Sequence, residues 1–454
     1  MAVKNLTKEN PLKLILTFML PIFIGNLFQL LYNFTDAVIV GRILGISALG
    51  AVGATTPIIF MIVSFIFATT QGFSVVTAQK FGARQYKLVR KSYFSSLLLS
   101  FLLTLFLILL ILPNIKAILL YLNTPSDILN MSNSYFSIII AGLFATVFYN
   151  MLSNVIRAVG DSRTPLYFLI LSSVLNIILD LLFVAKLNLN ISGAAYATII
   201  SQAISGILCV ILIHAKFSIL KLRFIDCIPH WKFLYKHIKI GIPMGIQISI
   251  LSMGKVILQL VLNGFGVEAV AAFTTGMRVD QIFYQIYLAL GITMANYTAQ
   301  NYGAKKISRI KQGAKIAMYI VCAITIFSII TLAFFSDNIV ALFMEIPNPE
   351  VVKLATIYLH TIMIFLFFLG TLLVYRNILQ GIGEVRFPLL SGVVELIVRG
   401  GSAIILGYYF KYSGICFATP FAWLSGAIVL FSGYRLSLYK KYKKNHGSKR
   451  INAR

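Results

Sequence analysis

Long apolar runs, separated by short polar segments, extend from about residue 12 to residue 435 of the chain. A helix needs about 20 apolar residues to cross the hydrocarbon core of a bilayer. Breaks at Pro, Gly, Asn and charge clusters divide the pattern into segments of at least that length. The sequence therefore predicts twelve transmembrane helices, at residues 12–40, 48–78, 92–112, 133–156, 164–185, 191–214, 238–263, 268–299, 313–335, 354–379, 387–410 and 413–435.

Composition supports a membrane protein. Hydrophobic residues make up 59% of the 454 residues and charged residues only 11%, whereas soluble domains carry about a quarter charged residues. So few charges exclude a soluble enzyme, a disordered chain and a disulfide scaffold. The first run, 12–40, is too long for the apolar part of a secretory signal and lacks a small-residue cleavage site, so we expect it to remain as the first span.

The distribution of Lys and Arg predicts the orientation. The net charge is +26, and the basic residues form short clusters between apolar runs, as in cytoplasmic loops rather than in a nucleic-acid-binding groove. With a cytoplasmic N-terminus, 31 Lys and Arg lie inside and only five outside, which are Arg42, Lys116, Lys186, Lys353 and Lys411. We therefore expect a multi-pass cell-membrane protein with both termini in the cytoplasm and no nucleic-acid partner.

The two halves of the chain repeat each other at an offset of 221–223 residues. Segment 77–85 recurs at 298–306, and segment 154–165 recurs at 377–388. Six spans per half is an even number, so both halves insert the same way up. The predicted fold is an all-α integral membrane protein of twelve transmembrane helices, in two parallel six-helix bundles related by a pseudo-twofold axis along the membrane normal.

These boundaries give four predicted regions. Residues 1–215 form an N-terminal six-helix bundle, residues 216–237 a cytoplasmic linker, and residues 238–435 a C-terminal six-helix bundle. Residues 436–454 form a basic cytoplasmic tail, which we expect to lie on anionic lipid headgroups. We expect the chain to act as a monomer.

Polar residues within the predicted spans mark a candidate ion site in the first half. Asp36 and Asp180 each lie six residues before the outer end of a span, so about 9 Å deep. Asn176 lies one turn from Asp180 on the same face, and Thr198 enters from outside to a similar depth. Because a charge at such depth costs about 2.5–3.5 kcal/mol on insertion scales, each acid needs a partner or a task.

Two functional interpretations and one structural interpretation fit these four residues. Two carboxylates, an amide and a hydroxyl suit Na⁺, since hard cations prefer oxygen ligands. The carboxyl pair could instead share a proton. The structural alternative is that these groups only form hydrogen bonds between helices.

The second half has a different polar set. Leu258 stands where the repeat would place an equivalent of Asp36. The embedded charges there are Lys255, Arg278, Asp280, Glu395 and Arg399. Glu395 and Arg399 are four residues apart and could pair along one helix. A mutually neutralising ion network and a role in coupling both fit this C-terminal polar network.

Prolines occur at matching places in the first span of each half. Pro21 and Pro243 lie within helical runs, where proline removes a hydrogen bond and kinks the helix. Such a bend could belong to a moving gate or be a static kink.

The sequence resembles the MATE (multidrug and toxic compound extrusion) family, of the bacterial drug/sodium antiporter type. The resemblance covers nearly the whole chain and includes the repeated Gln-x-x-Gly-Ala and Gly-Asp/Glu-x-x-x-Pro segments. It implies a cation-coupling site at Asp36, Asn176, Asp180 and Thr198. It also implies substrate contacts in the same bundle, at Gln29, Tyr32, Asn150 and Asn154.

The resemblance further implies a secondary antiporter that exports amphipathic or cationic organic compounds in exchange for Na⁺ or H⁺ by alternating access. No cofactor and no metal other than Na⁺ is implied. A flippase for a lipid-linked precursor, from the same superfamily, is the alternative that the basic residues of the second half favour. An enzyme is disfavoured, because no nucleophile–base or metal-ligand constellation is evident. The chain also lacks a Gly-x-x-x-x-Gly-Lys-Ser/Thr segment for ATP.

Overall fold

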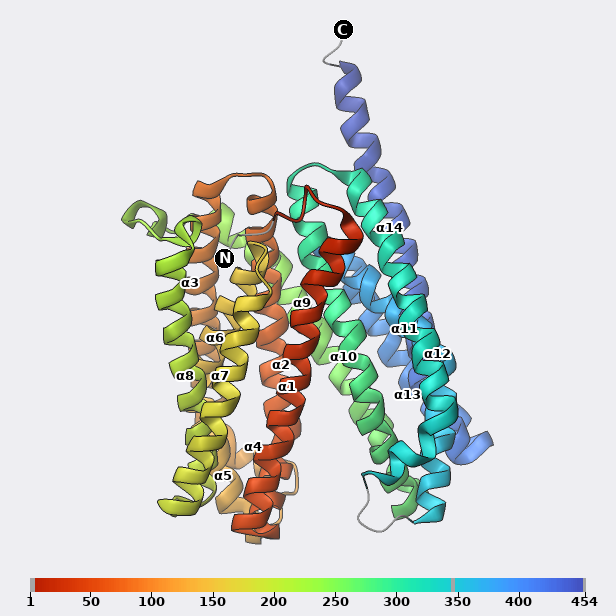
Figure 1. The fold of residues 1–454 in the computed structure, drawn as a ribbon. Helices are drawn as coiled ribbons and strands as arrows, with labels where there is room; N and C mark the ends of the chain where they lie inside the picture. The colour runs from red at the N-terminus through yellow and green to blue at the C-terminus, as the bar shows by residue number, and fades with distance from the viewer. Residues whose placement is uncertain (1–4, 344–347, 452–454) are drawn as a thin grey trace. The chain divides into compact units, whose positions relative to one another are not determined.

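In the computed structural model, which describes residues 5–343 and 348–451, the chain is built of helices (Figure 1). For residues 439–451 it describes the backbone alone, so the basic tail is a helical continuation as far as residue 451. The α-helices are α1 (Pro11–Leu44), α2 (Ile46–Gly82), α3 (Tyr86–Ile111), α4 (Ile115–Tyr121), α5 (Ser126–Ala141), α6 (Leu143–Ala158), α7 (Arg163–Asp180), α8 (Asn190–Lys216), α9 (Trp231–Leu262), α10 (Val267–Gly303), α11 (Ile307–Ala341), α12 (Pro349–Gly381), α13 (Arg386–Cys416) and α14 (Ala418–Ile451).

Each predicted span coincides with helical structure. Ten helical segments of the described chain are long and apolar enough to cross a membrane, and the bent pair α5–α6 brings the number to eleven. The fourth predicted span falls on this pair, whose two helices meet at 45° beside Gly142. The eighth predicted span falls on α10, which has 37 residues but is not apolar enough to be counted among these membrane-crossing helices.

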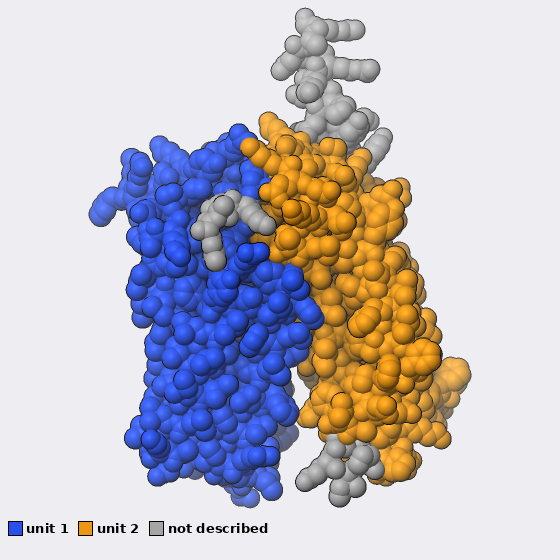
Figure 2. Space-filling model, viewed as in Figure 1, with its two compact units in different colours: residues 1–5, 20–245 blue, residues 6–19, 246–454 orange. Residues whose placement is uncertain are grey.

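Contacts divide the chain into two compact units, coloured in Figure 2. Unit 1 comprises residues 1–5 and 20–245, and unit 2 comprises residues 6–19 and 246–454. The first turns of α1 therefore belong to unit 2, and the first half of α9 belongs to unit 1. In both helices the chain passes from one unit to the other within three residues of an internal proline, Pro21 or Pro243.

Hydrogen bonds attach the start of the chain to unit 2. The Gln300 side chain accepts from the backbone N–H of Leu6 at 3.0 Å. Lys306 Nζ donates to the Thr7 carbonyl at 2.9 Å, and Arg309 Nη2 donates to the Glu9 carbonyl at 2.6 Å. The second Gln-x-x-Gly-Ala segment and the residues after it therefore hold the segment that leads into α1.

In unit 1, close backbone contact joins the first half of α9 to α2. A Cβ atom at Gly72 would lie 2.5 Å from the Cα of Gly241, so neither helix could carry a larger side chain at this crossing. His237, with no exposed surface, lies in the same half of α9, and its Nε2 is 2.8 Å from Ser92 Oγ. The Ser92 hydroxyl also bonds Thr77, which ties α9 to α2 and α3.

Repeated turn segments link the helices. Gly160 and Gly383 adopt positive φ angles of 95° and 79°, which glycine adopts at little cost. Asp161 Oδ1 accepts from the backbone N–H groups of Arg163 and Thr164, at 2.9 and 3.1 Å, where α7 begins. The Gly-Asp-x-x-x-Pro segment therefore has a structural role, as a turn followed by a helix cap.

Candidate functional site

In unit 1, residues from α1, α7 and α8 form an oxygen-rich acid cluster, which we define as Asp36, Asn176, Asp180 and Thr198. The carboxyl groups of Asp36 and Asp180 lie within hydrogen-bonding reach of each other. Asp180 and Asn176 have no exposed surface. The structure thus brings together the four residues that the sequence placed at one depth.

The Asn176 amide connects α7 to α8. In one orientation its Nδ2 lies 3.4 Å from Thr198 Oγ1. With the amide turned over, Nδ2 donates to Asp180 Oδ2 at 3.0 Å and Oδ1 accepts from the Thr198 backbone N–H at 3.2 Å. The second orientation satisfies both ends of the amide, so it describes the contact better. Asn176 therefore fixes the position of the Asp180 carboxylate.

Both acids keep one oxygen without a hydrogen bond. Among the described residues, nothing donates to the buried Oδ1 atoms of Asp36 and Asp180. A buried acceptor without a donor costs about 1–3 kcal/mol. A small cation or a shared proton would satisfy these oxygens, and carboxylate, amide and hydroxyl groups are suitable ligands for a hard cation.

Local backbone geometry places Asp180 at a helix irregularity. The α-helical hydrogen bonding of α7 ends at Asp180, and residues Leu181–Lys186 continue as a turn of π-helix. Gly193 of α8 packs against this turn, since a Cβ there would lie 3.1 Å from the Phe183 carbonyl carbon. Single π turns within α-helices frequently occur at functional sites.

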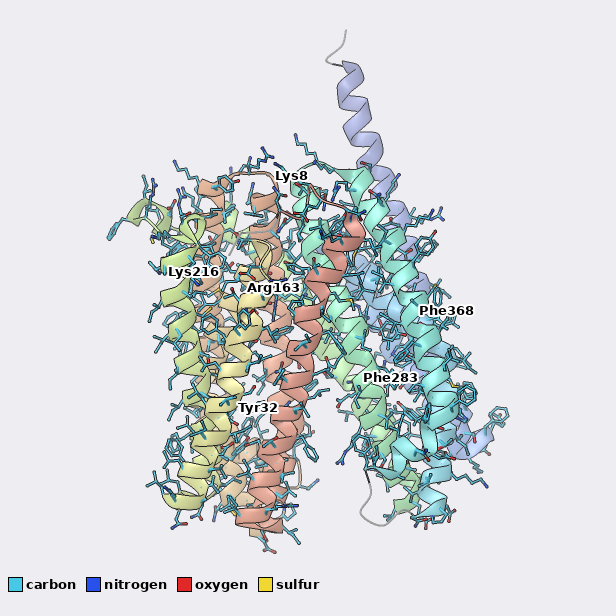
Figure 3. The ribbon with its side chains drawn as sticks, in the orientation of Figure 1. Lys8, Tyr32, Arg163, Lys216, Phe283 and Phe368 are labelled. Atoms are coloured by element: carbon cyan, nitrogen blue, oxygen red, sulfur yellow. The ribbon has the colours of Figure 1, made fainter. Side chains whose placement is uncertain are left out.

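Two tyrosines accompany the acid cluster. The Tyr32 hydroxyl donates to Thr198 Oγ1 at 3.4 Å, so this predicted substrate contact lies beside the acid cluster. The buried Tyr135, on α5, lies near enough for the charges of Asp36 and Asp180 to act on it. Figure 3 shows Tyr32 in the lower half of unit 1, whereas Lys216, at the end of α8, lies near its upper end.

The other three predicted substrate contacts do not form one group. Gln29 is exposed on α1, and Asn150 donates to the Thr146 carbonyl of its own helix at 2.8 Å. Asn154 is buried, donates to Thr70 Oγ1 at 3.2 Å and accepts from Arg157 at 3.3 Å. Asn154 therefore joins α6 to α2.

The predicted C-terminal polar network is only partly assembled in unit 2. Lys255 and Asp280 lie near enough for their charges to interact, and Tyr358 lies beside Asp280. Arg278 is exposed on α10 and takes no part in the salt bridges that the described residues form.

The predicted pairing of Glu395 with Arg399 is replaced by a contact between helices. Glu395 forms its ion pair with Arg376 of α12, at 2.5 Å, and also accepts from Ser391 at 2.6 Å. Sequence spacing could not reveal this pair, because Arg376 and Glu395 are on different helices. Arg399 remains in the same buried region, where its Nη1 lies 3.5 Å from the Leu251 carbonyl.

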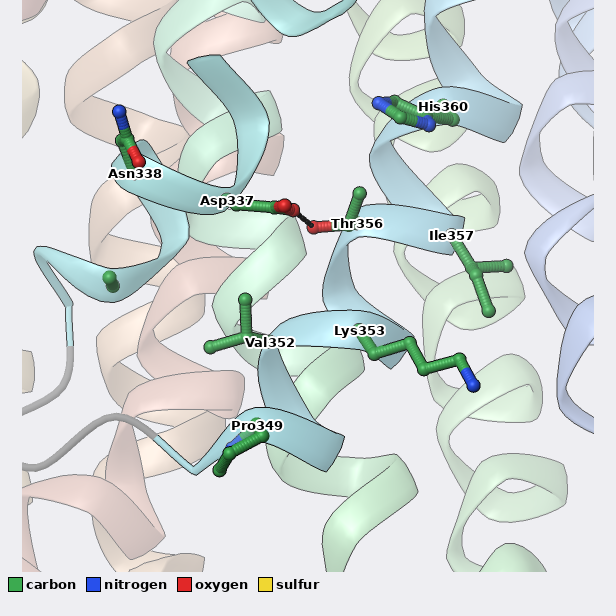
Figure 4. Close-up of a pocket in the computed structure, with 9 residues that line it drawn as sticks. Asp337, Asn338, Pro349, Val352, Lys353, Thr356, Ile357 and His360 are labelled. Carbon is green, nitrogen blue, oxygen red and sulfur yellow. Dashed lines mark hydrogen bonds between the residues drawn. The ribbon is translucent and has the colours of Figure 1, made fainter. Parts of the chain in front are cut away.

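A separate pocket lies in unit 2 between the end of α11 and the start of α12 (Figure 4). Asp337 accepts from Thr356 at 2.5 Å, and Ser336 lies 3.1 Å from His360 Nε2. These polar groups therefore satisfy one another, unlike those of the acid cluster. Among the described residues, no group of three or more His, Cys, Asp or Glu could hold a metal ion.

The long apolar helices define a multi-pass membrane protein. The chain belongs to the MatE family, whose model matches it twice, at residues 21–182 and 243–405. These segments begin at Pro21 and Pro243, so each half contains one copy of the family unit.

Known proteins resemble the chain over nearly its whole length. A Bacillus subtilis (strain 168) protein described as probable multidrug resistance protein YpnP is 27% identical, covering 98% of this chain and 99% of its own. The multidrug export protein MepA of Staphylococcus haemolyticus (strain JCSC1435) is 25% identical, and the match covers 94% of this chain and 95% of MepA.

Solved structures share the fold. An outward-facing multidrug resistance MATE family transporter gives a TM-score of 0.91 at 24% identity, covering 97% of this chain and 98% of its own. A MATE structure in a bent conformation gives a TM-score of 0.90 at the same identity and coverage. These matches confirm the predicted fold class of twelve membrane helices in two bundles.

Proposed function

We propose that the protein is a secondary multidrug efflux antiporter, which exports amphipathic organic compounds in exchange for Na⁺ or H⁺. The observation that carries this proposal is the acid cluster of unit 1, in which two embedded carboxylates face each other and each keeps an unsatisfied oxygen. The names of the relatives YpnP and MepA support the export of drugs.

Coupling follows from differential affinity. A cation at Asp36 and Asp180 shifts the conformational equilibrium only if one transport state binds it more tightly than the other. Because these acids belong to α1 and α7, a change in the separation of the two helices changes the distance between the carboxylates. We therefore propose that cation binding favours the state in which the two carboxylates are close together.

The test is efflux from vesicles in which a Na⁺ gradient and a pH gradient are imposed separately. Wild-type protein should export a cationic dye under one of the two gradients. The Asp36→Asn and Asp180→Asn variants should lose this gradient-driven efflux, since each removes a charge that the coupling cation requires.

Asp127→Asn is the matched control, because Asp127 is an exposed acid of unit 1 at the start of α5. It should export dye like the wild type. If the Asp36 and Asp180 variants insert normally and also export dye undiminished, the coupling site has been wrongly assigned.

A further inference from the structure

Unit 2 contains a basic cluster, defined here as Lys255, Arg376 and Arg399 together with the acids Asp280 and Glu395. Their charges act on one another. The cluster holds three cations and two carboxylates. The cluster therefore has one more positive than negative charge. Arg278, which is exposed two residues before Asp280, does not neutralise this positive charge.

Arg399 is a cation of this cluster with few hydrogen bonds to compensate its charge. Glu395 already accepts from Arg376 and Ser391, at 2.5 and 2.6 Å. Arg399 is only 4% exposed, and its Nε lacks a hydrogen-bond partner among the described residues. Its one described hydrogen bond is the 3.5 Å contact with the Leu251 carbonyl, at the limit of hydrogen-bonding distance. A buried guanidinium with this little compensation is costly.

The missing side chain of Gly254, on α9, leaves room for the guanidinium group of Arg399. A Cβ at Gly254 would lie 2.9 Å from Arg399 Nη1, so the guanidinium lies against the backbone of α9 where a side chain is missing. Lys255 is the next residue of α9 and is exposed. Two cations from α9 and α13 therefore converge on one turn of α9.

We propose that Arg399 and Lys255 form a recognition site for an anionic group, a carboxylate or phosphate, on the transported compound. Planar guanidinium groups bind carboxylate and phosphate through paired hydrogen bonds. The substrates would then include zwitterionic and anionic amphiphiles besides cations. This inference rests on the proposed export function and narrows its substrate class. The same chemistry would also accept an anionic lipid headgroup.

The experiment compares two dyes that differ in one group. A rhodamine with a free carboxylate and its methyl ester share the same cationic rings, so only the anionic group distinguishes them. Binding to the full-length protein is measured by fluorescence anisotropy, in nanodiscs of phosphatidylcholine. The wild type should bind the acid more tightly than the ester.

The variant Arg399→Gln should weaken binding of the acid about tenfold, the loss expected for a charge-assisted hydrogen bond, and leave binding of the ester unchanged. Arg386→Gln is the matched control, since it removes an exposed arginine from the same helix. Equal binding of both dyes by the wild type, or equal weakening of both by Arg399→Gln, would overturn the proposal.

A second arm uses the unaltered chain, so that misfolding of a variant cannot hide the result. Benzoate should displace the acid but not the ester, and displacement of neither dye contradicts the site. Nanodiscs with added phosphatidylglycerol separate the two sources of the anion. Arg399-dependent displacement of the acid by this lipid identifies a headgroup, and the lack of displacement identifies a soluble compound.

The inference and the proposed function can fail separately. Gradient-driven efflux of the ester, without any preference for the acid, leaves the antiporter standing and removes only the anion site. If binding of the acid depends on Arg399 but efflux is unaffected in Asp36→Asn, the anion site stands and the proposed coupling site fails.

Discussion

The acid cluster of unit 1 and the basic cluster of unit 2 occupy corresponding parts of the repeat. At the offset of 223 residues, Asn176 corresponds to Arg399 and Asp180 to Ala403. At 222 residues, Asp36 corresponds to Leu258 and Tyr32 to Gly254. One half therefore concentrates carboxylates, and the other concentrates cations, on the same helical scaffold.

This difference shows that helix packing and site chemistry are separable in this fold. The family model matches both halves, although Asp36, Asn176 and Asp180 do not keep their chemistry in the second half. Small and apolar replacements, such as Gly254 for Tyr32, open the space into which Arg399 extends. On the two proposals above, unit 1 binds the coupling cation and unit 2 binds the anionic group of the transported compound.

The largest expected effect comes from transferring the charge of one cluster to the other. Asn176→Arg gives unit 1 the residue that unit 2 has at the same place in the repeat. A guanidinium beside Asp36 and Asp180 would compete with a coupling cation, so gradient-driven dye efflux should be abolished. Efflux by this variant at the wild-type rate, after normal membrane insertion, would refute the division of roles.

The ion pair of unit 2 should matter for stability. Glu395→Gln leaves Arg376 buried without its charge partner, and breaking a buried pair costs about 3–5 kcal/mol. We expect a large loss of thermal stability in detergent, measured as retained monodisperse protein after heating. The Asp180→Asn variant should lose far less thermal stability than Glu395→Gln. Similar losses in the two variants would mean that both clusters are structural.

Replacing both members of this pair is the control. The double variant Arg376→Met/Glu395→Leu removes the unpaired charge, so it should recover most of the stability lost by Glu395→Gln. If the double variant is as unstable as the single one, the ion pair is not the source of the loss.

Close helix packing in unit 1 should have a smaller effect than the ion pair. Gly72→Ala places a methyl group 2.5 Å from the Gly241 Cα, and overpacking costs about 1–3 kcal/mol. Gly53→Ala, on the same helix, meets nothing within 4 Å and should be neutral or stabilising. Thermal inactivation of the two variants compares them, and equal stabilities would contradict the packing described for α2 and α9.

The smallest expected effect is at Tyr32. Tyr32→Phe removes the hydroxyl that donates to Thr198 Oγ1 at 3.4 Å, a hydrogen bond worth about 0.5–1.5 kcal/mol. The concentration of coupling cation needed for half-maximal efflux should rise several-fold while the maximal rate stays the same. A lower maximal rate with unchanged cation dependence would assign Tyr32 to substrate binding.

Periodicity and length were sufficient to predict the helices, because a membrane span must satisfy its backbone hydrogen bonds within a continuous apolar segment. The bend beside Gly142 and the π turn after Asp180 were not predicted. Both lie against α8, where Gly142 is close to Ile199 and Gly193 is close to Phe183. No local pattern in the sequence encodes these contacts.

The sequence grouped the members of the acid cluster because depth along a helix can be counted from the span ends. The sequence does not show which helices pack against each other, so it could not predict contacts between residues of different helices. The salt bridge between Arg376 and Glu395, and the position of Tyr135 near Asp36, therefore appear only in three dimensions. The same reason explains why the predicted substrate contacts separated into Tyr32 at the acid cluster and Asn154 in a structural contact.

Infrared difference spectroscopy of the purified protein tests most directly whether the acids of unit 1 hold the coupling cation. Addition of Na⁺, or a step in pH, should produce a carboxyl signal in the wild type. If these acids hold the coupling cation, the signal is lost in both Asp36→Asn and Asp180→Asn and kept in Asp127→Asn. A signal that is unchanged in the first two variants would contradict it.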